Sequence, residues 1–212
     1  MNINNFDSII FDLGGVIWNI SYQATSDAYI KLGFTDFNNW YSQANQKDLF
    51  NKIETGKISE NDFYNEIRKV SGLNLSNSEI ENAWNAMLLD LPTERIELIS
   101  QIAKTKPIYL LSNTNEIHLK KIEELLKNEE TNWDRFCGIF TKVYLSCRVG
   151  MRKPNEDIFL KVLNDNNLNA SKTLFIEDSI QHIETADKIG IQTLFLQPNP
   201  ANQKTIISEL VI

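Results

Sequence analysis

The chain has 212 residues, a length that fits one large domain or a domain that carries an insertion. It has 21 Lys and Arg against 28 Asp and Glu, a net charge of -7 that argues against nucleic acid or an anionic membrane as the main partner. No basic stretch followed by an apolar run opens the chain, and no stretch approaches about 18 consecutive apolar residues. We therefore expect a cytoplasmic protein with no signal peptide and no membrane span. The positions of Cys137 and Cys147, without a nearby histidine, predict reduced thiols and neither a disulfide nor a zinc site.

The first predicted element is a short buried strand that ends at an acid. The apolar run that starts at Ser8 is too short for a helix, Asp12 follows it, and Gly14 and Gly15 allow a tight turn. In an open α/β sheet, ligands bind outside the carboxyl ends of strands. Asp12 is therefore a candidate nucleophile or metal ligand, although an acid that merely caps a turn is the commoner case.

A run of helices is predicted between this strand and residue 89. Residues 22–32 form a helix that Gly33 ends, and the segments at Ser59 and Ser76 resemble capping boxes. After Ser76, apolar residues follow the helical spacing of a buried face, namely Ile80, Ala83, Trp84, Met87 and Leu88. We predict a helical cap subdomain at 18–89 and a core domain made of residues 1–17 and 90–212.

From Thr93 onward, helices alternate with strands. Strands are predicted at 108–111, 139–144, 174–176 and 193–196, with one intervening helix ending near residue 127 and another opening at Pro154. This alternation predicts a parallel sheet built by right-handed crossovers. The fold class is therefore α/β, a doubly wound Rossmann-like core with an inserted helical cap. Residues 205–212 are expected to pack on the sheet as a final helix.

Polar residues fall at or near the strand ends in four places: Asp12, the pair Ser112 and Asn113, Lys153, and the pair Glu177 and Asp178. Each suits phosphoryl transfer. A carboxylate can attack phosphorus, and a hydroxyl with an amide can hold the phosphoryl oxygens. A lysine can neutralise the charge on the phosphoryl group and on the nucleophile.

Several carboxylates that converge on one point repel each other unless a cation lies among them. Hard oxygen ligands beside a phosphate suit Mg²⁺, which keeps several waters and takes few protein ligands. The natural ligands are Asp12 and Asp178, with Glu177 as a further candidate and a backbone carbonyl near Gly14 completing the set.

Four segments together match the motifs of one known family. They read F-D-L-G-G-V at 11–16, L-L-S-N-T-N at 110–115, G-M-R-K-P-N-E-D-I-F at 150–159 and L-F-I-E-D-S at 174–179, the last followed by A-D-K-I-G-I at 186–191. In order and content they resemble the signature motifs of the haloacid dehalogenase superfamily. The match is nearest to its small-cap phosphatases (subfamily IA) with a first motif F-D-L-G-x-V, a branch that includes sugar-1-phosphate phosphatases.

The resemblance implies a role for each matched residue. Asp12 corresponds to the nucleophile, and Lys153 to the charge-stabilising lysine. Ser112 and Asn113 correspond to residues that hold the phosphate, with Ser112 counted among the catalytic residues. The paired acids Glu177 and Asp178 correspond to the metal site, where Mg²⁺ is the expected cofactor.

The chain departs from the family pattern at two positions. Most phosphatases of the superfamily have a second Asp two residues after the nucleophile, which acts as general acid and base, and here that residue is Gly14. Since such catalysis contributes about 10²–10⁴-fold, we expect a preference for good leaving groups, such as an anomeric oxygen or an aryl alcohol. The second departure is His182, where the family usually has Asp or Asn; we expect a solvated helix residue there.

We assign no catalytic role to the other residues near the motifs. Arg148 and Arg152 are expected to be surface charges, and His118 is assigned no role. Three residues just beyond the first motif could face the substrate from the cap: Trp18, Asn19 and Tyr22.

The expected function is a Mg²⁺-dependent phosphatase that hydrolyses a small phosphorylated metabolite, a sugar phosphate, through an aspartyl-phosphate intermediate. The protein is expected to act as a monomer or homodimer without nucleic acid or membrane partners. One alternative is a 2-haloacid dehalogenase, which works without a metal and therefore leaves Glu177 and Asp178 unexplained. Another is a non-catalytic binding module with an eroded site, which the retention of Asp12 and Lys153 weakens.

Overall fold

The computed structural model describes residues 2–41, 48–127 and 132–196, so the helix expected at 205–212 lies outside the described residues. Within these ranges, five strands form one parallel sheet in the order β3-β2-β1-β4-β5. They are β1 (Ser8–Phe11), β2 (Ile108–Ser112), β3 (Lys142–Leu145), β4 (Thr173–Glu177) and β5 (Gln192–Phe195). The first strand lies at the centre of the sheet and the chain then builds outward on both sides, which confirms the doubly wound α/β class.

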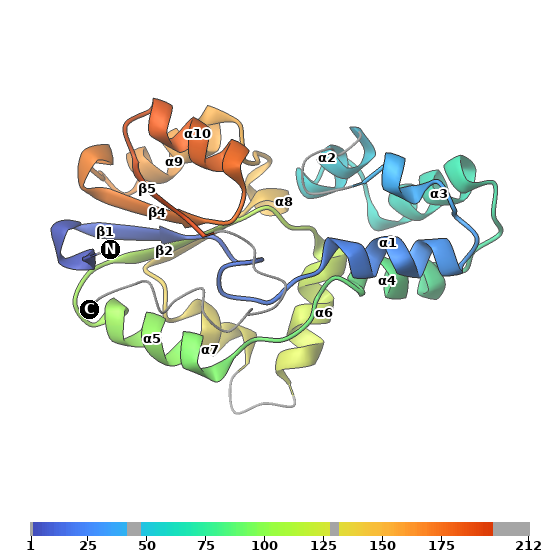
Figure 1. Ribbon diagram of the computed structural model, residues 1–212, viewed down its shortest axis with the longest axis horizontal. Helices are drawn as coiled ribbons and strands as arrows, with labels where there is room; N and C mark the ends of the chain where they lie inside the picture. Colours follow the sequence, from blue (N-terminus) through green and yellow to red (C-terminus); the bar gives the residue numbers. More distant parts are fainter. Residues whose placement is uncertain (1, 42–47, 128–131, 197–212) are drawn as a thin grey trace.

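Helices cover both faces of the sheet, as the apolar strands require (Figure 1). Successive residues of β1 point to opposite faces, because Ile9 and Phe11 belong to one apolar cluster and Ile10 to the other. The first cluster is closed by α5 (Thr93–Ala103), α6 (Glu116–Leu126) and α7 (Trp133–Cys137). The second is closed by α9 (Glu156–Asp165) and α10 (Ile180–Lys188), and α8 (Ser146–Val149) directly follows β3.

Four further helices lie together beyond the carboxyl ends of the strands (Figure 1). They are α1 (Tyr22–Lys31), α2 (Asp48–Glu54), α3 (Glu60–Ser71) and α4 (Asn77–Asn85). Their shared core is aromatic: the Phe50 and Trp84 rings stack with their centroids 5.3 Å apart, and Phe37 stacks on Tyr29 at 4.2 Å. This packing gives the four helices a hydrophobic centre distinct from the two clusters of the sheet, and Ile117 of α6 also belongs to it.

The predicted helix starts at Ser59 and Ser76 are confirmed, because each serine accepts a hydrogen bond from the backbone three residues on and the acid there reaches back. The helix expected to open at Pro154 begins instead at Glu156. The α4 helix ends at Asn85, so Met87 and Leu88 lie beyond it.

Two other sequence predictions can be compared directly with the structure. The strand expected at 139–144 is shorter and later, Lys142–Leu145, because α7 and the turn after it occupy the preceding residues. Both cysteines are free thiols, as expected. Among the described residues, none of the helices combines the length and apolar character needed to cross a lipid bilayer.

Candidate active site

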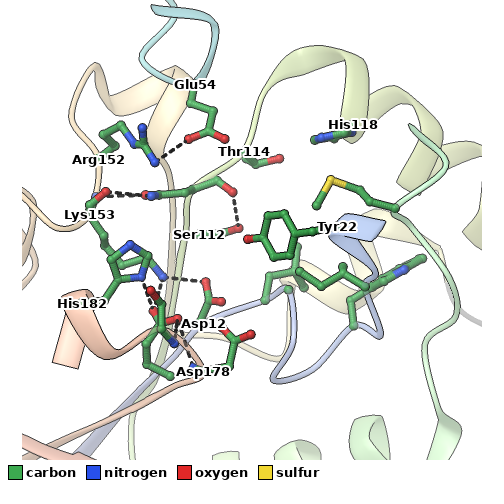
Figure 2. Close-up of a pocket in the computed structure, with 18 of the residues that line it drawn as sticks. Asp12, Tyr22, Glu54, Ser112, Thr114, His118, Arg152, Lys153, Asp178 and His182 are labelled. Carbon is green, nitrogen blue, oxygen red and sulfur yellow. Dashed lines mark hydrogen bonds and ion pairs between the residues drawn. The ribbon is translucent and has the colours of Figure 1, made fainter. Parts of the chain in front are cut away.

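A cavity of about 70 Å³ lies where the carboxyl ends of the central strands meet the helices α1–α4. Strand ends supply Asp12, Ser112 and Glu177, which the sequence predicted to converge, and the residues after them complete this side of the cavity. The other side is lined by residues of the helical part, among them Tyr22 and Glu54 (Figure 2). The structure therefore brings together the predicted residues and adds others from the inserted helices.

The turn after β1 allows two carboxylates to approach each other. Asp12 continues the sheet, because its N–H donates to the carbonyl of Ile176 at 3.0 Å. Gly15 has φ +80°, and a Cβ atom there would overlap the carboxylate of Asp178. A glycine is therefore required at this position both by the backbone conformation and by the space that Asp178 occupies.

Lys153 is the centre of the charged cluster. Its side chain is fully buried, and its Nζ lies 2.6 Å from Asp12 Oδ1 and 2.6 Å from Glu177 Oε2. Burial opposes the charge of this lysine, but the two carboxylates outweigh it and raise its pKa. Lys153 therefore stays protonated and holds both acids in place.

Asn113 fixes the backbone of this lysine. Its side-chain amide donates to the carbonyl of Lys153 at 2.8 Å and accepts from the Lys153 N–H at 2.9 Å. These two bonds engage the amide oxygen and one of its two N–H groups, so the second N–H is the donor that a phosphate contact from this side chain would use. Ser112, only 3% exposed, donates to the Asn113 carbonyl at a long 3.4 Å, which leaves its hydroxyl weakly held beside the cavity.

Glu177 has hydrogen-bond donors on both carboxylate oxygens. Oε1 accepts from the N–H groups of Asp178 and Ser179, each at 3.1 Å, while Oε2 contacts Lys153 and, at 3.0 Å, His182 Nδ1. Burial opposes ionisation, yet Lys153 and His182 lower the pKa of Glu177 to about 2. This carboxylate is therefore charged and already well satisfied.

The pKa values of the other two acids shift in the opposite direction. Burial, with the nearby charge of Glu177, raises the pKa of both Asp12 and Asp178 above the ordinary value of an aspartate. One oxygen from each of the three carboxylates lies within 4.8 Å of the others. Lys153 supplies one positive charge to three acids, so the cluster is suited to a divalent cation.

Two residues of the site have surroundings that differ from the sequence-based expectation. His182 is only 8% exposed and contacts Glu177, so the prediction of a solvated helix residue is wrong. The prediction of a surface charge is also wrong for Arg152, whose side chain is 12% exposed and pairs with the buried Glu54 at 3.0 Å. Arg148, by contrast, is half exposed and pairs with Glu116, as a surface charge would.

His118 also has a definite place, although the sequence assigned it no role. Its ring stacks on Trp84 with centroids 4.9 Å apart, and its Nδ1 lies 2.8 Å from Asn85 Oδ1. Burial lowers the pKa of His118 to about 3, so the ring is neutral. It lines the cavity together with Trp18 and Tyr22, the two predicted cap-facing residues that reach it.

A further part of the cavity lining was not foreseen. Glu54 ends the short helix α2, and nothing in its periodicity separates a buried acid from an exposed one. The available signals were local: Arg152 directly precedes Lys153, and His182 lies one helical turn after Asp178 at the start of α10. Asn19, the remaining cap candidate, hydrogen-bonds to Asp90.

The fold and the site together define an α/β enzyme with its active site at the carboxyl edge of a parallel sheet. A family model for haloacid dehalogenase-like hydrolases matches residues 127–196. A D-ribitol-5-phosphate phosphatase of Bacteroides thetaiotaomicron is 29% identical over 88% of this chain and 89% of its own.

Solved structures extend the similarity. A haloacid dehalogenase family enzyme of Bacteroides thetaiotaomicron, in complex with magnesium and inorganic phosphate, is 30% identical, with 92% of this chain and 96% of the other covered and a TM-score of 0.80. A predicted haloacid dehalogenase-like hydrolase of Porphyromonas gingivalis is 30% identical, with 96% of both chains covered and a TM-score of 0.81. The chain therefore belongs to the haloacid dehalogenase-like hydrolases, as its motifs predicted.

Proposed function

We propose that this enzyme is a Mg²⁺-dependent phosphatase that hydrolyses the phosphate ester of a small sugar or polyol. The observation that carries the proposal is the buried contact of Lys153 with Asp12 and Glu177, beside a third acid and the Ser112 hydroxyl. The magnesium and phosphate bound by the similar enzyme of Bacteroides thetaiotaomicron support the same chemistry. The named substrate of the ribitol-phosphate phosphatase supports a polyol or sugar ester.

In the proposed reaction, Asp12 is the nucleophile. Lys153 holds Oδ1, and Oδ2 attacks phosphorus, so that an oxygen–phosphorus bond to Asp12 forms while the bond to the leaving alkoxide breaks. The alkoxide takes its proton from water and leaves as the alcohol. Water then attacks the same phosphorus, which releases inorganic phosphate and restores the carboxylate. Ser112 donates its hydroxyl to a phosphoryl oxygen, and Asn113 keeps Lys153 in position through its backbone. Throughout, the ammonium group of Lys153 offsets the charge on the phosphoryl oxygens.

The donor set fits Mg²⁺, because it offers hard carboxylate oxygens and carries more negative charge than Lys153 neutralises. We assign Asp12, Asp178 and the backbone carbonyl of Gly14 as ligands. The hydrogen bonds on both oxygens of Glu177 weigh against direct coordination by that residue. When bound, the ion would neutralise the phosphoryl oxygens and orient the ester for attack.

We also propose that residues 18–89 form a cap over a core of residues 1–17 and 90–212. The separate aromatic cluster of α1–α4 supports this division. So does the cavity, which takes its lining from both parts.

The experiment is a phosphate-release assay with p-nitrophenyl phosphate, glucose 1-phosphate and D-ribitol 5-phosphate. We expect turnover with Mg²⁺, no turnover after addition of a chelator, and none in Asp12→Asn, which keeps the shape of the side chain but removes the nucleophilic charge. Equal rates for Asp12→Asn and the parent on all three esters would refute the assignment. Chelator-resistant release of halide from a 2-haloacid would favour the dehalogenase alternative.

The lack of an acidic side chain at Gly14 leads to a second kinetic prediction. The space of a side chain there is partly taken by Ile20, whose Cδ1 lies 3.0 Å from where a Cβ would be. Without an acid at this position, turnover depends on how well the alcohol leaves. We therefore expect a larger kcat for the aryl ester than for the primary alkyl ester of ribitol, by up to about 10²-fold. Equal kcat values for the two would show that another group protonates the leaving alcohol.

A further inference from the structure

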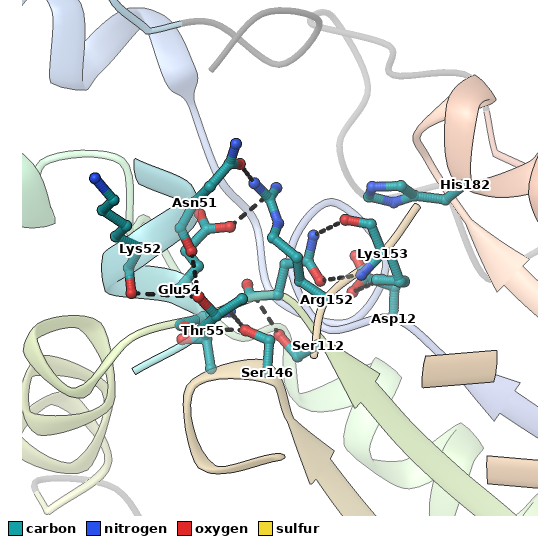
Figure 3. Close-up of polar contacts among 12 residues, drawn as sticks. Asp12, Asn51, Lys52, Glu54, Thr55, Ser112, Ser146, Arg152, Lys153 and His182 are labelled. Carbon is teal, nitrogen blue, oxygen red and sulfur yellow. Dashed lines mark hydrogen bonds and ion pairs between the residues drawn. The ribbon is translucent and has the colours of Figure 1, made fainter. Parts of the chain in front are cut away.

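The wall of the cavity away from the nucleophile contains a buried carboxylate. Figure 2 shows Glu54 on the opposite side of Ser112 from Asp12 and Asp178. Glu54 is 5% exposed and pairs with Arg152 Nη2 at 3.0 Å; Arg152 also hydrogen-bonds to Asn51 (Figure 3). A carboxylate has about four acceptor positions, so this single ion pair leaves Glu54 able to accept hydrogen bonds from a ligand.

The tautomer of His118 gives the cavity a second hydrogen-bond acceptor. The nitrogen Nδ1 faces the amide oxygen of Asn85, which can only accept, so we assign the proton of the neutral ring to Nδ1. The other nitrogen, Nε2, then carries a lone pair and no proton. Stacking on Trp84 holds the plane of the ring. Glu54 and His118 thus both present acceptors, from different helices, to the same cavity.

Resting on the phosphatase function proposed above, we propose that Glu54 and His118 determine substrate specificity. They accept hydrogen bonds from hydroxyl groups of the leaving alcohol, so the enzyme selects a neutral, polyhydroxylated ester and discriminates against an ester with a second anionic group. The two residues act on the part of the substrate that is not transferred.

The charge distribution supports discrimination as well as binding. Arg152 lines the cavity with a positive charge that could attract a second anion, and Glu54 pairs with it at 3.0 Å. An anion that approaches the buried pair also meets the carboxylate of Glu54, whose like charge opposes its binding. Specificity that arises from such repulsion is lost when the repelling charge is removed.

The test compares two esters that differ at one carbon. Glycerol 3-phosphate and 3-phosphoglycerate share a three-carbon chain, but one ends in a hydroxymethyl group and the other in a carboxylate. We expect the parent enzyme to favour glycerol 3-phosphate in kcat/KM, and Glu54→Gln to reduce that preference by about 10-fold or more. With p-nitrophenyl phosphate, which has no hydroxyl group to recognise, the rate should stay within about 3-fold of the parent.

Two further variants separate recognition from other effects. Glu60→Gln removes a different ion pair, between α3 and Lys120 of α6, outside the cavity lining, so it should leave the preference unchanged. His118→Phe keeps an aromatic ring against Trp84 but lacks the acceptor. It should lower kcat/KM for D-ribitol 5-phosphate about 10-fold and leave p-nitrophenyl phosphate turnover nearly unchanged.

The outcomes distinguish this inference from the function on which it rests. An unchanged preference in Glu54→Gln, with normal turnover of p-nitrophenyl phosphate, would overturn the specificity role alone. An equal loss of preference in Glu60→Gln would also overturn it, because the effect would then come from the ion pairs between helices. Absence of phosphate release by the parent enzyme from every ester would instead refute the phosphatase function.

Discussion

The surroundings of Gly15 show that the site has no space for a side chain at this position. Its backbone has φ +80°, and any side chain would occupy the position of the Asp178 carboxylate. Gly72 provides a comparison, because its φ is +68° at the end of α3 but no atom lies within 4 Å of a Cβ placed there. The two glycines share a backbone requirement, and only the first also faces a carboxylate of the site.

We therefore predict different consequences for Gly15→Ala and Gly72→Ala. Each should lower the free energy of unfolding by about 1–2 kcal/mol, because alanine is strained at positive φ. Gly15→Ala should also displace Asp178 and reduce Mg²⁺-dependent activity at least about 10-fold, whereas Gly72→Ala should keep it. Urea denaturation and a Mg²⁺ titration of the rate measure the two effects. Equal activities of the variants would show that Asp178 tolerates displacement.

His118 should make the stability of the protein sensitive to acid. Burial lowers its pKa to about 3 from the ordinary 6.5 of an exposed histidine, so between these pH values the unfolded chain binds a proton that the folded one does not. This contribution to stability is complete above pH 6.5 and is lost as the pH falls, by about 2 kcal/mol at pH 5. In His118→Phe the loss between pH 7 and pH 5 should be smaller by that amount, measured by urea denaturation. The same pH dependence in both proteins would contradict this.

Among the elements, the strands are the part of the site that the sequence predicted best. A short apolar run bounded by polar residues identifies a buried strand, and parallel strands bring their carboxyl ends to one edge. Asp12, Ser112 and Glu177 were therefore expected together, and the structure places them around one cavity. The docking of helices could not be predicted in the same way, because periodicity shows which face of a helix is apolar but not which strand end it meets.

Glu54 and Arg152 illustrate that limit. Each looks like a solvated charge in its own segment, and only the packing of α2 beside the loop before Lys153 buries the pair (Figure 3). The burial of His182 does not follow from its own segment either. Its burial follows from the position of α10 over the sheet, and its contact with Glu177 requires both residues to be buried together.

The capping box of α4 should contribute to the stability of the helical part. Ser76 Oγ accepts from the Glu79 N–H at 3.2 Å, and the Glu79 carboxylate accepts from the Ser76 N–H at 2.8 Å. We predict that Ser76→Ala lowers the free energy of unfolding by about 1 kcal/mol, because it leaves the N–H of Glu79 without its partner. Ser78→Ala, one residue into the helix and exposed, should change it by less than about 0.5 kcal/mol. Urea denaturation compares them, and equal values would argue against the cap.

Over the whole molecule, the family and the doubly wound core followed from four motifs and the alternation of strands and helices. The cavity wall that contains Glu54 and His118 did not, since it depends on how the α1–α4 helices meet the sheet. The core and the helical part both contribute buried charged residues to the cavity. The core gathers three carboxylates around one lysine, and the helical part adds Glu54 with its partner Arg152. The folded protein thus concentrates acids that the unfolded chain keeps apart.

This concentration of charge predicts a trade-off between stability and function at Asp178. Burial and the neighbouring acids raise its pKa, which means that its charged form destabilises the folded protein when no cation is bound. Asp178→Asn should therefore be at least as stable as the parent in the presence of a chelator, although inactive.

Mg²⁺ should reverse this order of stability, so that the parent becomes more stable than Asp178→Asn. Binding only to the folded state stabilises the parent by about 2.7 kcal/mol at a concentration 100 times its Kd. Asp178→Asn, which lacks one of the proposed ligands, should gain much less. Thermal unfolding with Mg²⁺ and with chelator gives four Tm values for the comparison. A variant less stable than the parent in chelator would mean that Asp178 supports the fold through its hydrogen bonds, and an equal Mg²⁺ shift in both would remove Asp178 from the ligand set.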